Sequence, residues 1–291
     1  MGNYGYICLN MRHHLFLLLF AVSCGGNIKK EPYRPTVVDT KPLTLLTKET
    51  IEDTIAGVAV TIVANLNDSV TTTALLVLPG WDFERHRWLN ETTVREEAKK
   101  HHYCLILPEM KRSIYATHYY QETTGAARKE KTGQWLTDTF IPAIQLKYNL
   151  LMPSSRNFVL GLSTGGRGAV YCAWKLPSLF MAAATLSGDF DQTMMPNDFL
   201  MTSVYGKYNS HQERWNKDDN LMYASESIRQ PLYIGHGDSD KVVPFNQSKV
   251  FYAKVKDTNQ KTKQHFVLKA GHNFKFWSSE VAPIFEFFDN L

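Results

Sequence analysis

Ser163 lies in the segment Gly161-Leu162-Ser163-Thr164-Gly165, between a short apolar run and a stretch rich in small and apolar residues. A G-x-S-x-G pattern between a strand and a helix is typical of a nucleophile elbow, a sharp turn that presents a serine hydroxyl for attack on a carbonyl carbon. Side chains at Gly161 and Gly165 would clash in such a turn. We therefore predict that Ser163 is a nucleophile, with a helix N-cap serine as the structural alternative.

A serine hydroxyl loses its proton as it attacks, so the site needs a histidine base that is oriented by a carboxylate. Asp240 and His272 lie in loops that follow two later apolar runs, which gives the chain order serine, acid, histidine. We predict that His272 is the general acid and base and that Asp240 is the acid. Asp238 is the alternative acid, and His236 is an alternative base although it precedes the acid.

A tetrahedral intermediate carries a negative charge that backbone N–H groups stabilise. The N–H of Thr164, directly after the nucleophile, is one expected donor. The second is the N–H of Trp81, which follows the apolar run ending at Leu78; Gly80 and Asp82 are alternatives.

These loops need a sheet that brings them together. Val58–Val63 alternates in the period of a strand, and with Leu43–Leu46 it predicts an early antiparallel hairpin. Later runs are apolar throughout, which is typical of parallel strands buried on both faces. The runs are Ala74–Leu78, Tyr103–Leu107, Phe158–Leu160, Ala182–Leu186, Leu232–Ile234 and Phe266–Leu268.

Helical segments separate most of these runs. Leu136, Phe140, Ile144 and Tyr148 form one apolar stripe, with a kink expected at Pro142. Further helices are predicted over 166–175, 245–256 and 278–289. This alternation predicts a single α/β domain over residues 37–291, with a mostly parallel central sheet flanked by helices.

Two stretches, 109–131 and 189–228, are too long for simple connections and follow strand ends, where α/β sheets bind their ligands. Both are rich in aromatic residues. We predict that Tyr119 and Trp215 contact the substrate, and the alternative is that these aromatic side chains only pack the loops.

The first residues have the character of an export signal, namely a basic start at Arg12 and a short apolar run. Residues 1–23 are predicted to be a signal peptide, with Met11 as a plausible true start. Ala21-Val22-Ser23-Cys24 resembles a bacterial lipobox, so Cys24 is predicted to carry lipid and residues 24–36 to tether the domain to a membrane surface of the cell envelope. An ordinary cleaved signal with an incidental cysteine is the alternative.

The composition excludes several classes of protein. With 44% apolar residues and 21% charged residues, the chain of 291 residues is neither disordered nor a coiled coil. Its net charge of +4 is small and dispersed, so a nucleic-acid partner is not expected. Cys104 and Cys172 lie in apolar runs and are predicted to be buried thiols. No metal and no cofactor is expected.

From about residue 74 onward, the chain resembles the esterase D-like branch of the α/β-hydrolases. This branch includes S-formylglutathione hydrolases, feruloyl and acetylxylan esterases, and mycolyltransferases. The acid loop Gly235–Pro244 is closer to prolyl-oligopeptidase-like and dienelactone-hydrolase-like relatives. The segments that carry the resemblance are Leu78-Pro79-Gly80, Phe140-Ile141-Pro142, Gly161–Gly168 with Ala169, Pro177-Ser178-Leu179-Phe180 and Leu186-Ser187-Gly188.

The resemblance implies a carboxylesterase that acts through an acyl-serine intermediate. Export favours extracellular substrates, either small acyl esters or esters linked to carbohydrate. An acyltransferase, a prolyl-oligopeptidase-like peptidase and a non-catalytic surface lipoprotein are the alternatives.

Overall fold

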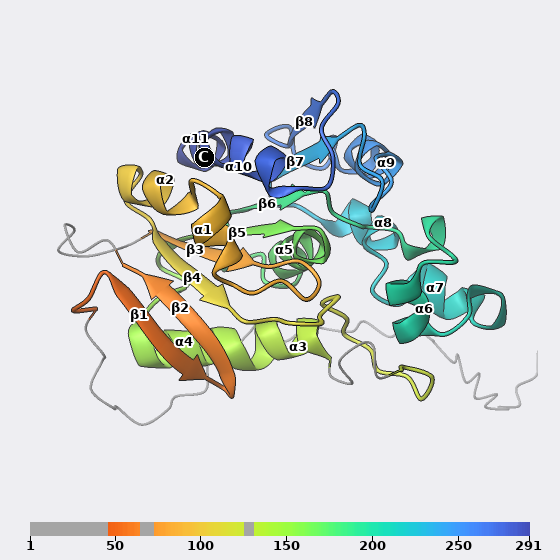
Figure 1. Ribbon diagram of the computed structural model, residues 1–291, viewed down its shortest axis with the longest axis horizontal. Coiled ribbons are helices and arrows are strands. Elements are labelled where there is room, and N and C mark those ends of the chain that lie inside the picture. Colours follow the sequence, from red (N-terminus) through yellow and green to blue (C-terminus); the bar gives the residue numbers. More distant parts are fainter. Residues whose placement is uncertain (1–45, 65–72, 125–130) are drawn as a thin grey trace, which may run out of the picture. The chain divides into compact units, whose positions relative to one another are not determined.

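The computed structural model describes residues 46–64, 73–124 and 131–291. Its core is an eight-stranded sheet with the order β1-β2-β4-β3-β5-β6-β7-β8 (Figure 1). The β1–β2 and β2–β4 pairs are antiparallel, and the other pairs are parallel. The predicted fold class is therefore confirmed. The strands are β1 (Thr50–Ile55), β2 (Val58–Val63), β3 (Thr73–Leu78), β4 (Cys104–Pro108), β5 (Arg156–Leu162), β6 (Ala182–Leu186), β7 (Leu232–Gly237) and β8 (Lys263–Val267).

Helices cover both faces of the sheet (Figure 1). One face packs against α4, α5 and α9, and the other against α1, α2, α10 and α11. Because the central strands are covered on both sides, every residue of β3, β4 and β6 is buried, as their apolar runs predict. The helices are α1 (Arg87–Glu91), α2 (Val94–Lys100), α3 (Thr132–Trp135), α4 (Ile141–Tyr148), α5 (Thr164–Lys175), α6 (Phe199–Tyr205), α7 (Gln212–Lys217), α8 (Leu221–Ala224), α9 (Asn246–Val255), α10 (Phe274–Ser279) and α11 (Val281–Asp289).

The predicted hairpin exists, but its first strand was placed wrongly. β1 is Thr50–Ile55, whereas Leu43–Leu45 lie outside the described residues and Leu46 is in irregular structure. The turn Ala56-Gly57 has φ angles of 49° and 79°, as a two-residue hairpin turn requires. The charged residues of β1 obscure the pattern that would mark it as a strand in the sequence. Their partners lie far along the chain, since Glu52 pairs with Arg85.

The helical stripe through Leu136, Phe140 and Ile144 is confirmed, since all three side chains are fully buried. Where the sequence predicts a kink at Pro142, the structure has a π-helical turn, Leu136–Phe140, between α3 and α4. Pro142, in the first turn of α4, has no N–H to donate to the preceding turn, which accounts for the wider hydrogen bonding there.

The two long loops pack against each other. The second loop contains α6, α7 and α8. In the first loop, the N–H of Thr124 donates to the carbonyl oxygen of Ser203 at 2.8 Å. Six side chains form a shared apolar cluster, which we call the loop cluster. Its members are Ile114, Ala116, Met201, Val204, Tyr205 and Trp215. Within the described ranges, no helix has the length and apolar character needed to cross a membrane.

Candidate active site

Ser163 occupies a sharp turn between β5, which ends at Leu162, and α5, which begins at Thr164. Its backbone has φ 55° and ψ −128°, a strained combination for a residue with a side chain. Hydrogen bonds hold this conformation, because the N–H of Ser163 donates to Leu186 O at 2.8 Å and its carbonyl oxygen accepts from Gly166 N at 2.9 Å. The Ser163 side chain makes no capping hydrogen bond, so the N-cap alternative is not supported.

Two glycines make this turn sterically feasible. A Cβ on Gly161 would lie 1.9 Å from the carbonyl oxygen of Gly165. A Cβ on Gly165 would lie 2.4 Å from the carbonyl oxygen of Leu78. Both contacts are with backbone atoms that cannot move aside, which confirms the steric reason for the glycines of the motif.

Asp240 and His272 are hydrogen-bonded, with 2.7 Å between Asp240 Oδ2 and His272 Nδ1. The other carboxylate oxygen, Oδ1, accepts from the N–H groups of Val242 and Val243 at 2.8 and 2.9 Å. Asp238 is exposed and instead accepts from the N–H of Lys269 at 2.7 Å. The geometry therefore favours Asp240 over Asp238 as the acid that orients His272.

His236 is fully buried, and both of its ring nitrogens are engaged. Nδ1 lies 2.7 Å from Ser248 Oγ, while Nε2 lies 3.1 Å from the carbonyl oxygen of Val243 and 3.3 Å from Asp240 Oδ2. Because Nε2 faces two acceptors, it carries the proton, and Nδ1 accepts from Ser248. His236 therefore supports Asp240 and has no free nitrogen with which to act as a base.

The surroundings of Asp240 keep its carboxylate ionised. Burial alone would raise the pKa of Asp240, but hydrogen bonds from His236, His272 and the N–H of Val243 outweigh it and hold the pKa well below its usual range. A carboxylate facing Nδ1 fixes the proton of His272 on that nitrogen, which leaves Nε2 as the basic atom.

Contacts between aromatic rings connect His272 to the strand ends near Ser163. The ring of His272 meets Trp277 edge-on, with centroids 4.9 Å apart, and Trp277 in turn packs against Phe83. In the same segment as Phe83, a Cβ on Gly80 would lie only 3.2 Å from that of Ser163. The nucleophile turn, the segment after β3 and the His272 loop thus converge at one edge of the sheet.

The oxyanion donors can be narrowed from this geometry. The N–H of Asp82 donates to Lys111 O at 2.9 Å, which removes it as an alternative. Thr164 is the first residue of α5, and the first N–H groups of a helix have no partner within it. The N–H groups of Thr164 and Trp81 stay our prediction, with Gly80 as the alternative to Trp81.

The two predicted substrate contacts differ in position. Tyr119 is 43% exposed and can meet a ligand. Trp215 is fully buried in the loop cluster, and its indole N–H donates to Gly206 O at 3.0 Å. The prediction of a substrate contact at Trp215 was therefore wrong, because this side chain forms the core on which the loop folds.

Cys104 and Cys172 are buried, as predicted, and burial raises the pKa of the Cys104 thiol to about 12. They are consequently poor nucleophiles. Among residues 46–64, 73–124 and 131–291, no group of three or more His, Cys, Asp or Glu side chains is arranged to hold a metal ion.

Comparison with known proteins places the chain among relatives of this architecture. Residues 117–291 match the model of the prolyl oligopeptidase family, a match that includes Ser163, Asp240 and His272. The chain belongs to the prolyl oligopeptidase family. This result agrees with the resemblance of its acid loop, and it identifies the protein as a serine hydrolase of the α/β-hydrolase type.

Individual relatives are distant. An acetyl esterase of Caldicellulosiruptor saccharolyticus is 20% identical over 240 residues, which cover 77% of this chain and 86% of that protein. An S-formylglutathione hydrolase from Agrobacterium tumefaciens has a TM-score of 0.64 at 13% identity, covering 83% of this chain and 93% of that one. A ferulic acid esterase has a TM-score of 0.61 at 16% identity, covering 83% and 96%. At these identities the two solved structures show a shared fold.

Proposed function

We propose that this member of the prolyl oligopeptidase family is a carboxylesterase that forms an acyl-enzyme on Ser163. The observation that carries the proposal is the strained Ser163 turn at the sheet edge where His272 is held by Asp240. The Ser163 side chain caps no helix, so no capping hydrogen bond offsets the backbone strain of this turn. Strain of this kind is retained where it presents a reactive group.

In the proposed reaction, His272 Nε2 removes the proton of Ser163 as the hydroxyl oxygen attacks the ester carbonyl carbon. The oxyanion accepts hydrogen bonds from the N–H groups of Thr164 and Trp81. The bond from carbon to the alcohol oxygen then breaks, and His272 returns the proton to the leaving alcohol. Water repeats these steps on the acyl-serine, which releases the acid and restores Ser163. Asp240 stays ionised throughout and stabilises the imidazolium.

The proposed substrates are esters of acetyl or similarly small acyl groups, including groups carried on extracellular carbohydrate. The acetyl esterase relative supports this substrate class. A peptidase is the second candidate, because the family of this chain is named for an oligopeptidase. Both reactions use the same acyl-serine intermediate, so they differ only in the leaving group.

We further propose that the protein is exported and held at a membrane surface by lipid on Cys24. The signal peptide, Cys24 and the tether lie outside the described residues, so the sequence carries this part of the proposal. Cys24→Ala should move the protein from the membrane fraction to the soluble or uncleaved form. Unchanged membrane partitioning of the variant would contradict lipidation.

A substrate panel tests the proposed reaction directly. Acetylated xylan, feruloyl esters, p-nitrophenyl acetate and short peptides are incubated with the unmodified protein and, as a matched control, with Ser163→Ala. We expect hydrolysis of the acetyl esters that is lost in the control. Turnover confined to peptides would contradict the proposed esterase activity and favour the peptidase. Ester turnover that survives in Ser163→Ala would refute Ser163 as the nucleophile.

A further inference from the structure

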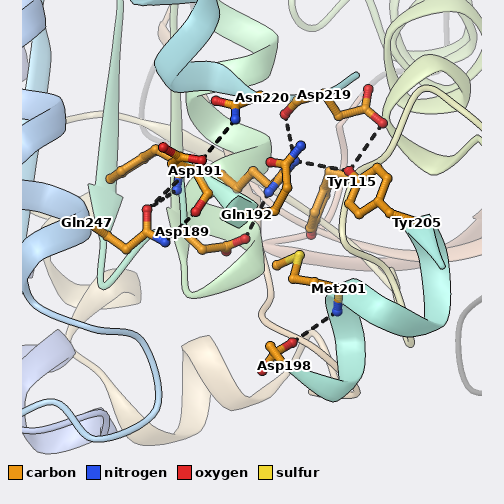
Figure 2. Close-up of polar contacts among 12 residues, drawn as sticks. Tyr115, Asp189, Asp191, Gln192, Asp198, Met201, Tyr205, Asp219, Asn220 and Gln247 are labelled. Carbon is orange, nitrogen blue, oxygen red and sulfur yellow. Dashed lines mark hydrogen bonds and ion pairs between the residues drawn. The ribbon is translucent and has the colours of Figure 1, made fainter. Parts of the chain in front are cut away.

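Arg167 lies one helical turn after Ser163 in α5, and it is 1% exposed. An arginine keeps its charge at any ordinary pH, so a buried arginine requires acceptors for its N–H groups. The guanidinium group of Arg167 donates to four acceptors. The four residues that supply these acceptors are labelled close together in Figure 2. The acceptors are Asp189 Oδ2 at 3.0 Å, Gln192 Oε1 at 3.2 Å, Tyr205 Oη at 3.1 Å and the carbonyl oxygen of Asp219 at 2.6 Å.

These acceptors come from separate parts of the long loop 189–228. Asp189 and Gln192 follow β6, Tyr205 ends α6, and Asp219 follows α7. Gln192 extends the contacts, because its amide donates to the carbonyl oxygens of Trp215 and Asp218 at 2.9 and 2.7 Å. A single side chain of the nucleophile helix thereby contacts three separate parts of this loop.

The other long loop is attached through Asp219. The N–H of Thr117 donates to Asp219 Oδ1 at 2.9 Å, and His118 Nδ1 lies 3.3 Å from the same oxygen. Next to them, Tyr120 Oη donates to Asp218 Oδ2 at 2.5 Å. The position of the segment that contains Tyr119 is therefore also set by residues held on Arg167.

Both loops border the proposed oxyanion segment. Tyr115 Oη, in the first loop, donates to the carbonyl oxygen of Pro79 at 2.8 Å, and the Tyr115 ring lies against Gly168. The side chain of Trp81 packs against the loop cluster. A shift of the loops would thus change the residues that can contact a substrate next to the oxyanion segment, while Ser163, Asp240 and His272 stay in place.

We propose that Arg167 is a positioning residue that sets substrate specificity by holding both long loops against the nucleophile helix. This inference rests on the proposed esterase function. Its ion pair with Asp189 is not an efficient source of stability, because Asp189 Oδ1 is buried without a hydrogen-bond partner among the described residues and burial raises the pKa of this carboxyl. The pair instead specifies one arrangement of the loops.

The test compares Arg167→Met and the milder Tyr205→Phe, which removes one hydroxyl from the network and keeps the ring. The Tyr205 hydroxyl donates to Asp219 Oδ2 at 3.3 Å. Tyr233→Phe is the matched control, since it also deletes a buried hydroxyl bonded to a carboxylate, that of Glu280 at 2.9 Å, outside the loops. For each folded variant, kcat and KM are measured with p-nitrophenyl acetate and with p-nitrophenyl esters of longer acyl chains. Fluorophosphonate labelling of Ser163 is measured in parallel.

We expect the ratio of kcat/KM between long-chain and acetyl esters to change about tenfold in Arg167→Met and by a smaller factor in Tyr205→Phe, mainly through KM. Labelling should continue in both variants, and the control should keep the unmodified ratio. An unchanged ratio in Tyr205→Phe and in any folded Arg167→Met protein would overturn the inference, even where all rates fall together. If the unmodified protein hydrolyses no ester, the proposed function fails first, and this inference fails with it.

Discussion

Asp240→Asn is the substitution whose effect follows most directly from the observed hydrogen bonds. Asp240 Oδ1 accepts two backbone N–H groups, which the amide oxygen of asparagine can also accept. The amide nitrogen would replace Oδ2, which now faces two N–H donors, His272 Nδ1 and His236 Nε2. A donor would then meet two donors, so His272 must move its proton to Nε2 and lose its ability to act as a base.

The size of the effect can be worked out from these contacts. Two hydrogen bonds to a charged group are lost, each worth about 1.5–3 kcal/mol. A histidine held in the wrong tautomer lowers kcat by about 10⁴ in such a triad, which corresponds to about 5.5 kcal/mol in activation free energy. This value lies within the range of about 3–6 kcal/mol that the two hydrogen bonds give together. KM should change little, because Asp240 contacts His272 and not the substrate.

The assay is steady-state hydrolysis of p-nitrophenyl acetate at neutral pH, with Asp238→Asn as the matched control in the same loop. Asp238 is exposed, so its substitution should leave kcat within about twofold. If Asp240→Asn keeps kcat within tenfold of the unmodified protein, or if Asp238→Asn is the more damaging change, our reasoning about the acid is wrong.

Four further substitutions test the fold around the site. Gly161→Ala should cost about 3 kcal/mol or more in the free energy of unfolding, measured in urea, because its Cβ would lie 1.9 Å from a backbone oxygen. Trp215→Ala removes a buried aromatic side chain and should lower the free energy of unfolding by about 3–5 kcal/mol. Tyr119→Ala removes an exposed side chain and should change the free energy of unfolding by about 0.5 kcal/mol or less. Equal losses in the two variants would contradict their different burial. A hydrogen bond with Asp219 raises the pKa of His118 above 6.5, so this pair stabilises the loops below that pH and loses its effect as pH rises through the folded-state pKa. The difference in Tm between the unmodified protein and His118→Gln should accordingly shrink on going from pH 5.5 to about 8.5, and a constant difference would exclude this linkage.

The buried strands could be predicted from the sequence because their burial on both faces leaves an unbroken apolar run. Ala182–Leu186 was predicted with its observed bounds. β1 could not be predicted, because Asp53 is matched by Lys147 at 2.6 Å, a partner that is adjacent only in the folded chain. Local patterns do not record such long-range pairing.

The predictions about the site divide in a similar way. Ser163, Asp240 and His272 follow strand ends, and this position is what makes them candidates in the sequence. The burial of Trp215 depends on how two loops fold together, which aromatic content alone does not reveal. Arg167 was missed, although an arginine among small and apolar residues of a predicted buried helix is a signal that it needs acceptors. His236 was considered as a base, and only its partners Ser248 and Asp240 show that it supports the acid.

The most direct test of the central claim is to identify the atom that becomes acylated. The protein is treated with a fluorophosphonate, and its intact mass and the mass of the peptide that contains Ser163 are measured, with Ser163→Ala as the control. We predict one adduct per chain, located on Ser163, no adduct on the variant, and a fall in ester turnover of about 10⁵–10⁶ in the variant. An adduct on another residue, or a Ser163→Ala protein that retains near-native turnover, would contradict the assignment of Ser163 as the nucleophile.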